Sequence, residues 1–169
     1  QAIQLEPAFA QPYAELGSIY TEMHWQQTDT FPHILDSAKR MIDIAMRLDP
    51  NVPEPHEALG WYYYHGLRDF NAALAEFSTV LKLQPNNALA LASTAWVKRR
   101  QGKWPETIAA LELVNNLDPR DPWFRYELGI TYQSCRRYRD AIAQYDQAIA
   151  LLPDHRWAYI LKSWALLNQ

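Results

Sequence analysis

Apolar side chains recur along the chain at intervals of three and four residues, separated by short polar segments. Leu59 and Tyr63 show this spacing in one segment, and Ile142, Tyr145 and Ile149 show it in another. Such spacing places apolar side chains on one face of an α-helix. It predicts the tail of a truncated hairpin at residues 1–5, followed by amphipathic helices at about residues 10–24, 34–48, 53–66, 70–83, 87–101, 104–117, 121–135, 138–151 and 155–168.

Prolines mark the ends of a repeated unit within this pattern. Leucine stands two positions before each of them, and they are Pro7, Pro50, Pro85, Pro119 and Pro153. Subtracting their sequence numbers gives spacings of 43, 35, 34 and 34, and hence a period of 34 with two insertions. Because a proline disfavours a helical residue before it, each proline predicts the end of a helix. The nine extra residues of the first unit lie near residues 24–33.

Small residues fall in register when the units are aligned on these prolines. Gly17, Gly60 and Gly129 coincide, and each is followed three positions later by a tyrosine. A small residue on an apolar face allows two helices to approach closely, so each unit predicts a helical hairpin. Gly66 and Gly102 are expected in the short turns of two hairpins. We expect these larger side chains to be buried: Tyr63, Phe77 and Tyr132.

This arrangement resembles the tetratricopeptide repeat, and the resemblance covers essentially the whole chain. It implies an all-α fold, a right-handed solenoid of helical hairpins with four full repeats and a half repeat at each end. Because single hairpins cannot bury their apolar faces, they are expected to stack, with the first helices on a concave face. One domain over residues 1–169 is predicted, with repeats at about 8–50, 51–85, 86–119, 120–153 and a half repeat at 154–169.

Composition narrows the class of protein. Hydrophobic residues make up 49% of the chain and charged residues 21%, which is typical of a folded globular protein. The net charge of -3 argues against nucleic acid as a partner. The longest uncharged stretch, residues 83–97, contains Pro85 and is too short to span a membrane. The single cysteine fits a reducing compartment, and we expect a cytoplasmic location.

The sequence offers little catalytic chemistry. The five histidines do not have metal-ligand spacing, although His24 and His33 flank the first insertion. Cys135 precedes Arg136, so positive charge could lower its pKa, but no general base is positioned beside it in the sequence. No glycine-rich phosphate loop occurs. We therefore expect no enzymatic activity, no metal and no cofactor.

Tryptophans recur on one face of the predicted first helices. Trp61, Trp96 and Trp164 each follow the small position of their repeat by one residue. The resemblance implies that this face lines the concave groove, where tryptophan and arginine are common anchors. The alternative is that some rings only fill space between neighbouring helices. The expected partner-binding residues are Trp61, His65, Trp96, Arg99, Arg100, Trp123, Tyr126, Trp157 and Trp164.

The segment from Leu59 to Phe77, with residues 83–88, resembles tetratricopeptide regions of multidomain bacterial signalling proteins. Such proteins carry an adenylate cyclase, a serine/threonine kinase or a winged-helix regulator. The resemblance favours a protein-interaction scaffold, cut from a longer chain, that binds a peptide or another domain of its parent. The alternative is a regulatory or substrate-recruiting arm of an enzyme whose catalytic domain lies elsewhere.

The last predicted helix is apolar on nearly every face. Lys162 is the one charged residue between Trp157 and Leu167. A terminal helix of a soluble solenoid should carry a polar outer side. We therefore expect something to cover this helix: the second half of its hairpin, or a second copy of the chain in a homodimer with Trp164 or Leu167 near the contact.

Overall fold

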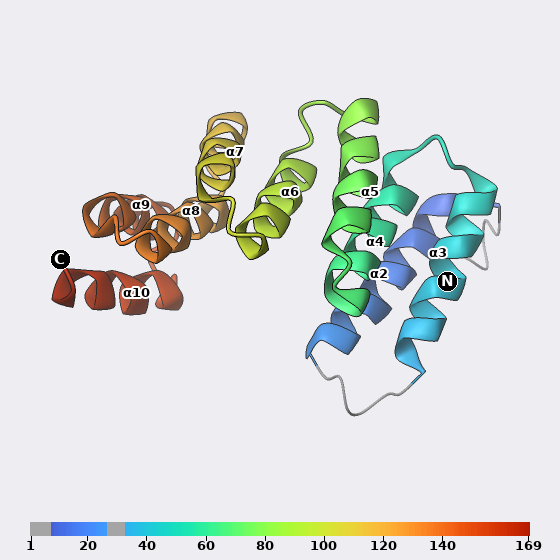
Figure 1. Ribbon diagram of the computed structural model, residues 1–169, viewed down its shortest axis with the longest axis horizontal. Helices are drawn as coiled ribbons and strands as arrows, with labels where there is room; N and C mark the ends of the chain where they lie inside the picture. Colours follow the sequence, from blue (N-terminus) through green and yellow to red (C-terminus); the bar gives the residue numbers. More distant parts are fainter. Residues whose placement is uncertain (1–7, 27–32) are drawn as a thin grey trace. The chain divides into compact units, whose positions relative to one another are not determined.

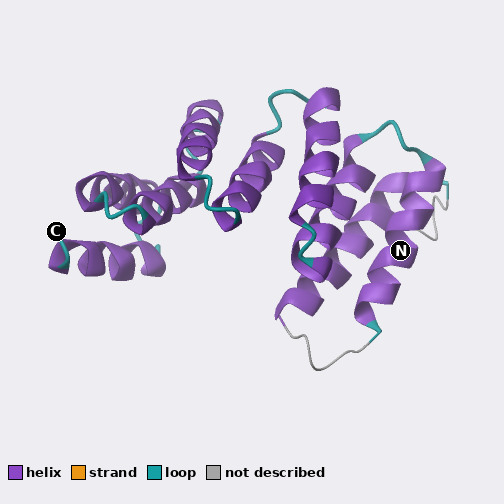
Figure 2. Ribbon diagram, in the orientation of Figure 1, coloured by secondary structure: helices purple, strands orange, loops and turns teal. Residues whose placement is uncertain are grey.

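The computed structural model of the chain describes residues 8–26 and 33–169, and every regular element in these ranges is a helix (Figure 1, Figure 2). The all-helical prediction is confirmed. The predicted bounds agree with the observed ones to within two residues, except at residues 53–66, and the predicted element at residues 1–5 lies outside the described residues. The helices are α2 (Ala10–Gln26), α3 (Ile34–Leu48), α4 (Pro53–Trp61), the π-helix η1 (Tyr62–Leu67), α5 (Phe70–Leu83), α6 (Ala88–Arg100), α7 (Trp104–Leu117), α8 (Pro122–Ser134), α9 (Tyr138–Leu151) and α10 (Arg156–Leu167).

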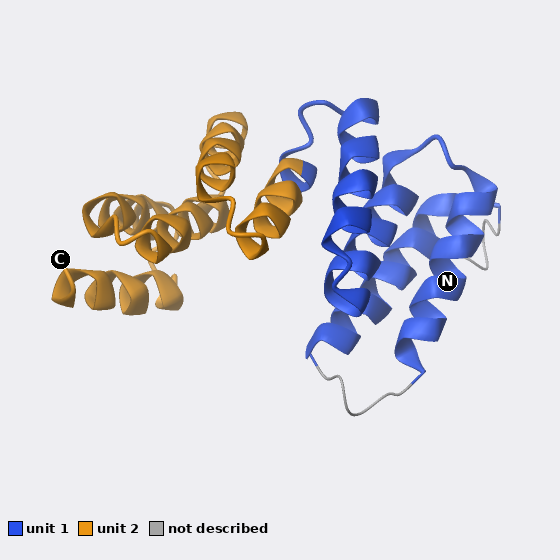
Figure 3. Ribbon diagram, in the orientation of Figure 1, with its two compact units in different colours: residues 1–90 blue, residues 91–169 orange. Residues whose placement is uncertain are grey.

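The chain divides into two compact units, residues 1–90 and 91–169 (Figure 3). Unit 1 contains α2, α3, α4, η1 and α5, and unit 2 contains most of α6 together with α7 to α10. The expectation of one continuous solenoid over residues 1–169 stays a prediction. None of the helices in the described ranges is long and apolar enough to cross a membrane.

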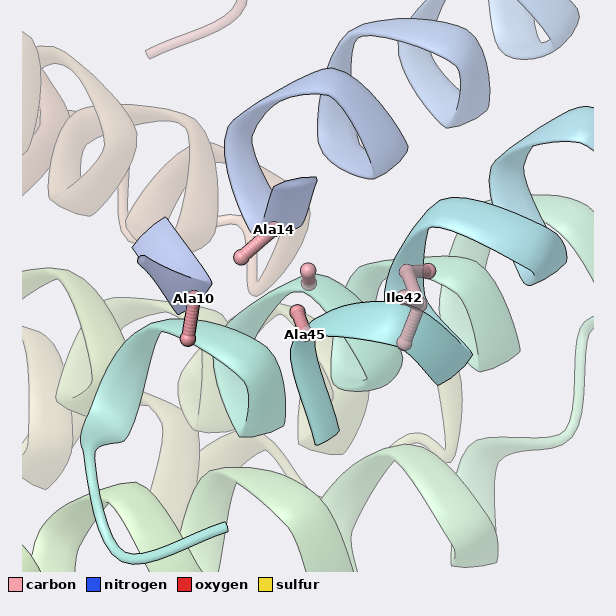
Figure 4. Close-up of a cluster of buried hydrophobic side chains, with 5 residues drawn as sticks. Ala10, Ala14, Ile42 and Ala45 are labelled. Atoms are coloured by element: carbon pink, nitrogen blue, oxygen red, sulfur yellow. The ribbon is translucent and has the colours of Figure 1, made fainter. Parts of the chain in front are cut away.

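In unit 1, α2 packs against α3 and α4 packs against α5, and α2 also contacts α4. Their meeting point is a cluster of small apolar side chains around one larger one, Ile42 (Figure 4). Small side chains let the helix backbones approach closely, so little space remains for rearrangement. The small members of the cluster are Ala10, Ala14, Ala45 and Ala58.

The aligned glycines lie where the two helices of a hairpin meet. A Cβ atom on Gly60 would lie 2.5 Å from ring atom Cε1 of Phe77, and one on Gly129 would lie 2.5 Å from Cε1 of Tyr145. Both rings are fully buried. The predicted role of these glycines in close helix contact is confirmed, because any larger residue would overlap the ring across from it.

The three described hairpin turns after α4 share one backbone feature. Arg68, Gly102 and Arg136 follow one another at the repeat period, and their φ angles are +55°, +73° and +59°. Gly102 was correctly expected in a turn, since glycine adopts positive φ without strain. The prediction that Gly66 lies in a turn is wrong. Gly66 lies inside η1, where a Cβ would be 2.8 Å from Cδ2 of Leu35. It therefore serves close packing against α3.

The π-helix η1 accounts for the unit that is one residue longer than the period. In an α-helix one inserted residue is commonly absorbed as a π-turn, and the backbone N–H of Arg68 donates to the carbonyl of Tyr63, five residues back. The insertion moves Tyr64, not Tyr63, into the position that Tyr132 occupies, four residues before the positive-φ residue. Tyr64 and Tyr132 are both buried, whereas Tyr63 is partly exposed. The predicted burial of Tyr132 and Phe77 is thus confirmed, and that of Tyr63 is wrong.

Unit 2 is built around α8. This helix contacts α7 and α9, and α10 packs on α9. Between α7 and α8, the Tyr132 hydroxyl donates to Glu112 Oε1 at 2.6 Å, and Asn115 Nδ2 donates to the Phe124 carbonyl at 3.2 Å. These bonds link the second helix of one hairpin to the first helix of the next, which fixes the stacking inside the unit.

Candidate partner-binding site

The two predicted groove residues of unit 1, Trp61 and His65, belong to a cluster of rings. The His65 ring stacks on Trp25 at 4.5 Å between centroids with a 13° interplanar angle, and it lies 4.9 Å from Trp61. Glu22 is 3.5 Å from His65 Nδ1. Trp25, at the end of α2, was not among the predicted residues. It lies seven positions after Ser18, the counterpart of Trp61 in the first repeat, so the helical spacing could have revealed it.

Next to this cluster, α2 and α4 line an acidic cavity of about 450 Å³ that is open to solvent. Burial raises the pKa of the Glu57 carboxyl, a hydrogen bond from the Trp61 side chain lowers it, and the nearby Glu54 raises it. Side chains that cannot carry positive charge line the whole cavity, so its potential is negative. The lining residues are Ala14, Glu15, Ser18, Ile19, Glu54 and Glu57. The sequence pattern did not predict this cavity.

In unit 2, four predicted tryptophans are at least partly exposed. Trp157 is the most exposed, at 60%, and Trp123 and Trp164 are each exposed by nearly half. Trp96 is partly exposed. Two of these rings are supported by aromatic neighbours: Trp123 lies 5.4 Å from Tyr126, and Trp164 lies 5.8 Å from Tyr138 in an edge-on arrangement. Such contacts hold a ring in place while another side of it faces solvent.

Tyr126 lies in the core of unit 2 rather than on an open surface. It is 8% exposed, and its ring is surrounded by those of Trp123, Tyr145 and His155. Burial raises the pKa of its hydroxyl. The expectation that Tyr126 extends the exposed row is therefore corrected, because the rings of Tyr145 and His155 pack around it.

The two predicted arginines have different surroundings. Arg99 Nη1 is 2.9 Å from Glu127 Oε2, and Glu127 is almost fully buried, so the pair ties α6 to α8. Arg99 also lies 3.4 Å from the Thr131 hydroxyl. Arg100 is exposed. Arg99 is thus held by the fold, and Arg100 lies on the surface.

Two of the histidines serve the fold. His56 Nδ1 lies 2.7 Å from Glu76 Oε2, and His155 Nδ1 accepts a hydrogen bond from the Ala158 backbone at the start of α10. Burial raises the pKa of the Cys135 thiol more than Arg137 lowers it, so the suggested lowering of this pKa is wrong. In residues 8–26 and 33–169, no group of three or more His, Cys, Asp or Glu side chains could hold a metal ion.

Solved structures show what the fold resembles. The chain superposes on a chain of the APC/C hetero-tetramer Cut9–Hcn1 with a TM-score of 0.77 and 20% identity, covering 94% of this chain and 30% of that one. It matches MamA with a TM-score of 0.69 and 22% identity, covering 94% of this chain and 81% of MamA. It matches YrrB, described as a tetratricopeptide-repeat protein with an unusual peptide-binding site, with a TM-score of 0.69 and 23% identity, covering 96% of this chain and 78% of YrrB.

These likenesses, none of them above 23% identity, establish the fold. The chain spans less than a third of the length of the matched chain of the Cut9–Hcn1 complex. No curated protein matches it significantly in sequence. The sequence profile described as tetratricopeptide repeat matches residues 62–122 and 126–169, more than half of the chain. With hairpins of the same period and glycine packing in both units, the chain belongs to the tetratricopeptide repeat family.

Proposed function

We propose that this chain is a non-catalytic protein-interaction scaffold that binds a peptide or a partner domain on the tryptophan-bearing face of its first helices. The observation that carries the proposal is the exposure of Trp123, Trp157 and Trp164 in a unit whose core is already filled. Tryptophan is highly buried on average in folded proteins, and it is among the commonest binding anchors.

Unit 1 contributes a different chemistry to this proposal. Its cavity combines three carboxylates with the exposed apolar side chain of Ile19 and lies close to the ring cluster of Trp61 and His65. Negative potential favours a segment that carries lysine or arginine, and indole rings also attract such cations. A ligand with basic and apolar residues would therefore satisfy this part of the surface.

The cellular setting is part of the same proposal. We place the chain in the cytoplasm, in a multidomain bacterial signalling protein, where it binds a peptide or another domain of its parent. The resemblance of residues 59–77 and 83–88 to such proteins supports this placement. A recruiting arm for a catalytic domain elsewhere is the second candidate, and it uses the same exposed tryptophans.

Selection of a displayed random-peptide library on the full chain tests the scaffold function. The best binder is measured by calorimetry against Trp61→Ala and Trp123→Ala, and at least one substitution should weaken binding by about 2 kcal/mol or more. Leu113→Ala, which removes an exposed side chain of the second helix α7, is the matched control and should leave affinity unchanged. No selectable peptide, or binders sensitive to Leu113 and not to either tryptophan, would contradict the proposal.

A further inference from the structure

The cavity between α2 and α4 lies where the row of tryptophans on the first helices is interrupted. Ser18 is the α2 counterpart of Trp61, Ala14 lies one helical turn before it, and both residues line the cavity. Each of the other described first helices carries at least one larger side chain at this pair of positions: Glu57 and Trp61 in α4, Ala92 and Trp96 in α6, Tyr126 and Ile130 in α8, and Ile160 and Trp164 in α10. The cavity thus occupies a position at which the later repeats carry a larger side chain.

Three glutamates line this space without a basic partner. Glu15 belongs to α2, and Glu54 and Glu57 belong to α4. None of the ion pairs within residues 8–26 and 33–169 includes one of these three side chains. Glu15 accepts a hydrogen bond from the Gln11 side chain at 2.8 Å, but that group is neutral. Because the three carboxylates repel one another, a cation in the cavity would lower the electrostatic energy.

Glu57 is the carboxyl group that such a cation would affect most. Burial raises its pKa, the hydrogen bond from the Trp61 side chain lowers it, and the nearby Glu54 raises it. Burial and the charge of Glu54 both disfavour the ionised form, and a bound cation would favour it. A carboxyl group perturbed in this way inside a cavity is typical of a binding site.

The arrangement of the carboxylates favours an extended cation over a metal ion. No group of three or more His, Cys, Asp or Glu side chains in the described part of the chain could hold a metal ion, so the three glutamates do not converge on one point. The guanidinium group of arginine has five N–H donors in one plane and reaches acceptors on different sides, whereas the lysine ammonium group is a compact point charge. The volume of about 450 Å³ lies in the range of ligand pockets.

We propose that this cavity binds one arginine side chain of the peptide or partner domain, with its guanidinium group between Glu15 on α2 and Glu57 on α4. Ile19, which also lines the cavity, is 54% exposed, so an apolar residue beside the arginine would fit as well. This inference rests on the scaffold function proposed above and adds the residue type that unit 1 selects. A lysine side chain is the alternative that the test separates.

Three capped dipeptides serve as probes: acetyl-arginyl-leucine amide, its lysine analogue and its citrulline analogue. Citrulline has nearly the shape of arginine but no charge. Each probe is titrated into the full chain, isotopically labelled at its indole nitrogens and observed by nuclear magnetic resonance. The Trp61 indole signal, identified by its loss in Trp61→Phe, reports on the cavity because this N–H group donates to Glu57.

The arginine probe should shift the Trp61 signal saturably. It should bind about tenfold or more tightly than the citrulline probe, because a charged donor makes stronger hydrogen bonds to carboxylates than a neutral one does. It should also bind more tightly than the lysine probe, because only arginine presents a planar fork of donors.

Substitutions assign the binding to the cavity. Ser18→Trp fills the space with a ring and should abolish binding. Glu57→Gln keeps the size of the side chain and should weaken binding by about tenfold or more, and it keeps the test decisive if Ser18→Trp does not fold. Glu106→Gln, which neutralises an exposed carboxylate of α7 in unit 2, is the matched control and should leave binding unchanged. Circular dichroism verifies that each variant is folded.

Several results would overturn the proposal. They are an unchanged Trp61 signal at roughly 10 mM arginine probe, tenfold above a Kd of about 1 mM, a citrulline or lysine probe that binds as tightly as the arginine probe, and binding that neither Ser18→Trp nor Glu57→Gln weakens. Failure of the scaffold function would look different. Selected peptides that depend on Trp123, together with an arginine probe that does not bind, would leave the scaffold function standing and refute the arginine site. An arginine probe that binds when no peptide can be selected would support the site and contradict the wider scaffold function.

Discussion

Replacing Gly129 with alanine tests the close packing on which each hairpin depends. The new Cβ would lie 2.5, 2.7 and 3.0 Å from three ring atoms of Tyr145. Favourable contacts between carbon atoms are about 3.5–4.0 Å, so the ring or the helix must move by about 1 Å. The ring is fully buried, and no neighbouring space receives it without a backbone shift.

The expected change in the free energy of unfolding combines two destabilising effects, over-packing and a disturbed hydrogen bond, with one stabilising effect, the higher helix propensity of alanine. Over-packing costs about 1–3 kcal/mol. Displacing the ring also disturbs the hydrogen bond from the Tyr145 hydroxyl to Gln133 Oε1, which is 2.9 Å long, at a cost of about 0.5–1.5 kcal/mol. Alanine regains about 1 kcal/mol because it favours helix more than glycine does. The free energy of unfolding should therefore fall by about 0.5–3.5 kcal/mol.

Urea denaturation, followed by circular dichroism and tryptophan emission, measures this change as a lower midpoint with an unchanged slope. Adding Tyr145→Leu to Gly129→Ala should restore part of the loss, because leucine leaves room for the Cβ, and the two changes should not be additive. Gly66→Ala is the matched control. There the Cβ meets Cδ2, the far end of the Leu35 side chain, at 2.8 Å, so a smaller loss is expected. An alanine variant at Gly129 as stable as the parent chain would refute this account of the packing.

Four further changes test other features. Arg136→Gly should stabilise the chain by about 1 kcal/mol, because a positive φ strains a residue with a Cβ, and Gly102→Arg should destabilise it similarly, both read from thermal unfolding. Burial, then the hydrogen bond to Glu112, raises the pKa of Tyr132 to about 12. The stability that this shift supplies is complete below pH 10 and lost as the pH rises toward 12, and Glu112→Gln should lower the pKa seen by ultraviolet titration. Deleting Tyr63 should convert η1 to an α-helix, with little loss of the helical signal in circular dichroism. A large loss of helicity would contradict the conclusion that η1 accommodates the one extra residue of this repeat.

Much of the fold follows from the sequence because its signals are repeated. The prolines and glycines recur with the same period in several repeats. Because of this redundancy, the predicted bounds of the helices α3, α5, α7 and α9 equal the observed ones. The wrong prediction that Tyr63 is buried has a physical cause. Spacing reveals that one residue is inserted between Gly60 and Ala73, but it does not reveal where the backbone absorbs it. Hydrogen bonding in η1 decides that.

The site was less predictable than the fold. Periodicity assigns a residue to a helical face, but exposure depends on what the neighbouring helix places opposite it. Tyr126 is buried because Tyr145 and His155 pack around it, and Arg99 is engaged because Glu127 lies across from it on α8. The acidic cavity depends on residues of two different repeats, which no single-helix pattern brings together.

The π-helix η1 also determines how this chain can be recombined. On its N-terminal side, α4 aligns with α8 at an offset of two periods plus one residue, as Gly60 does with Gly129. On its C-terminal side the offset is two periods, as for Arg68 and Arg136. A hybrid hairpin spliced across η1 with a single offset would rotate every later side chain of that helix by about 100°. Grafting a groove from one repeat onto another therefore requires the alignment offset to change by one residue within residues 62–67.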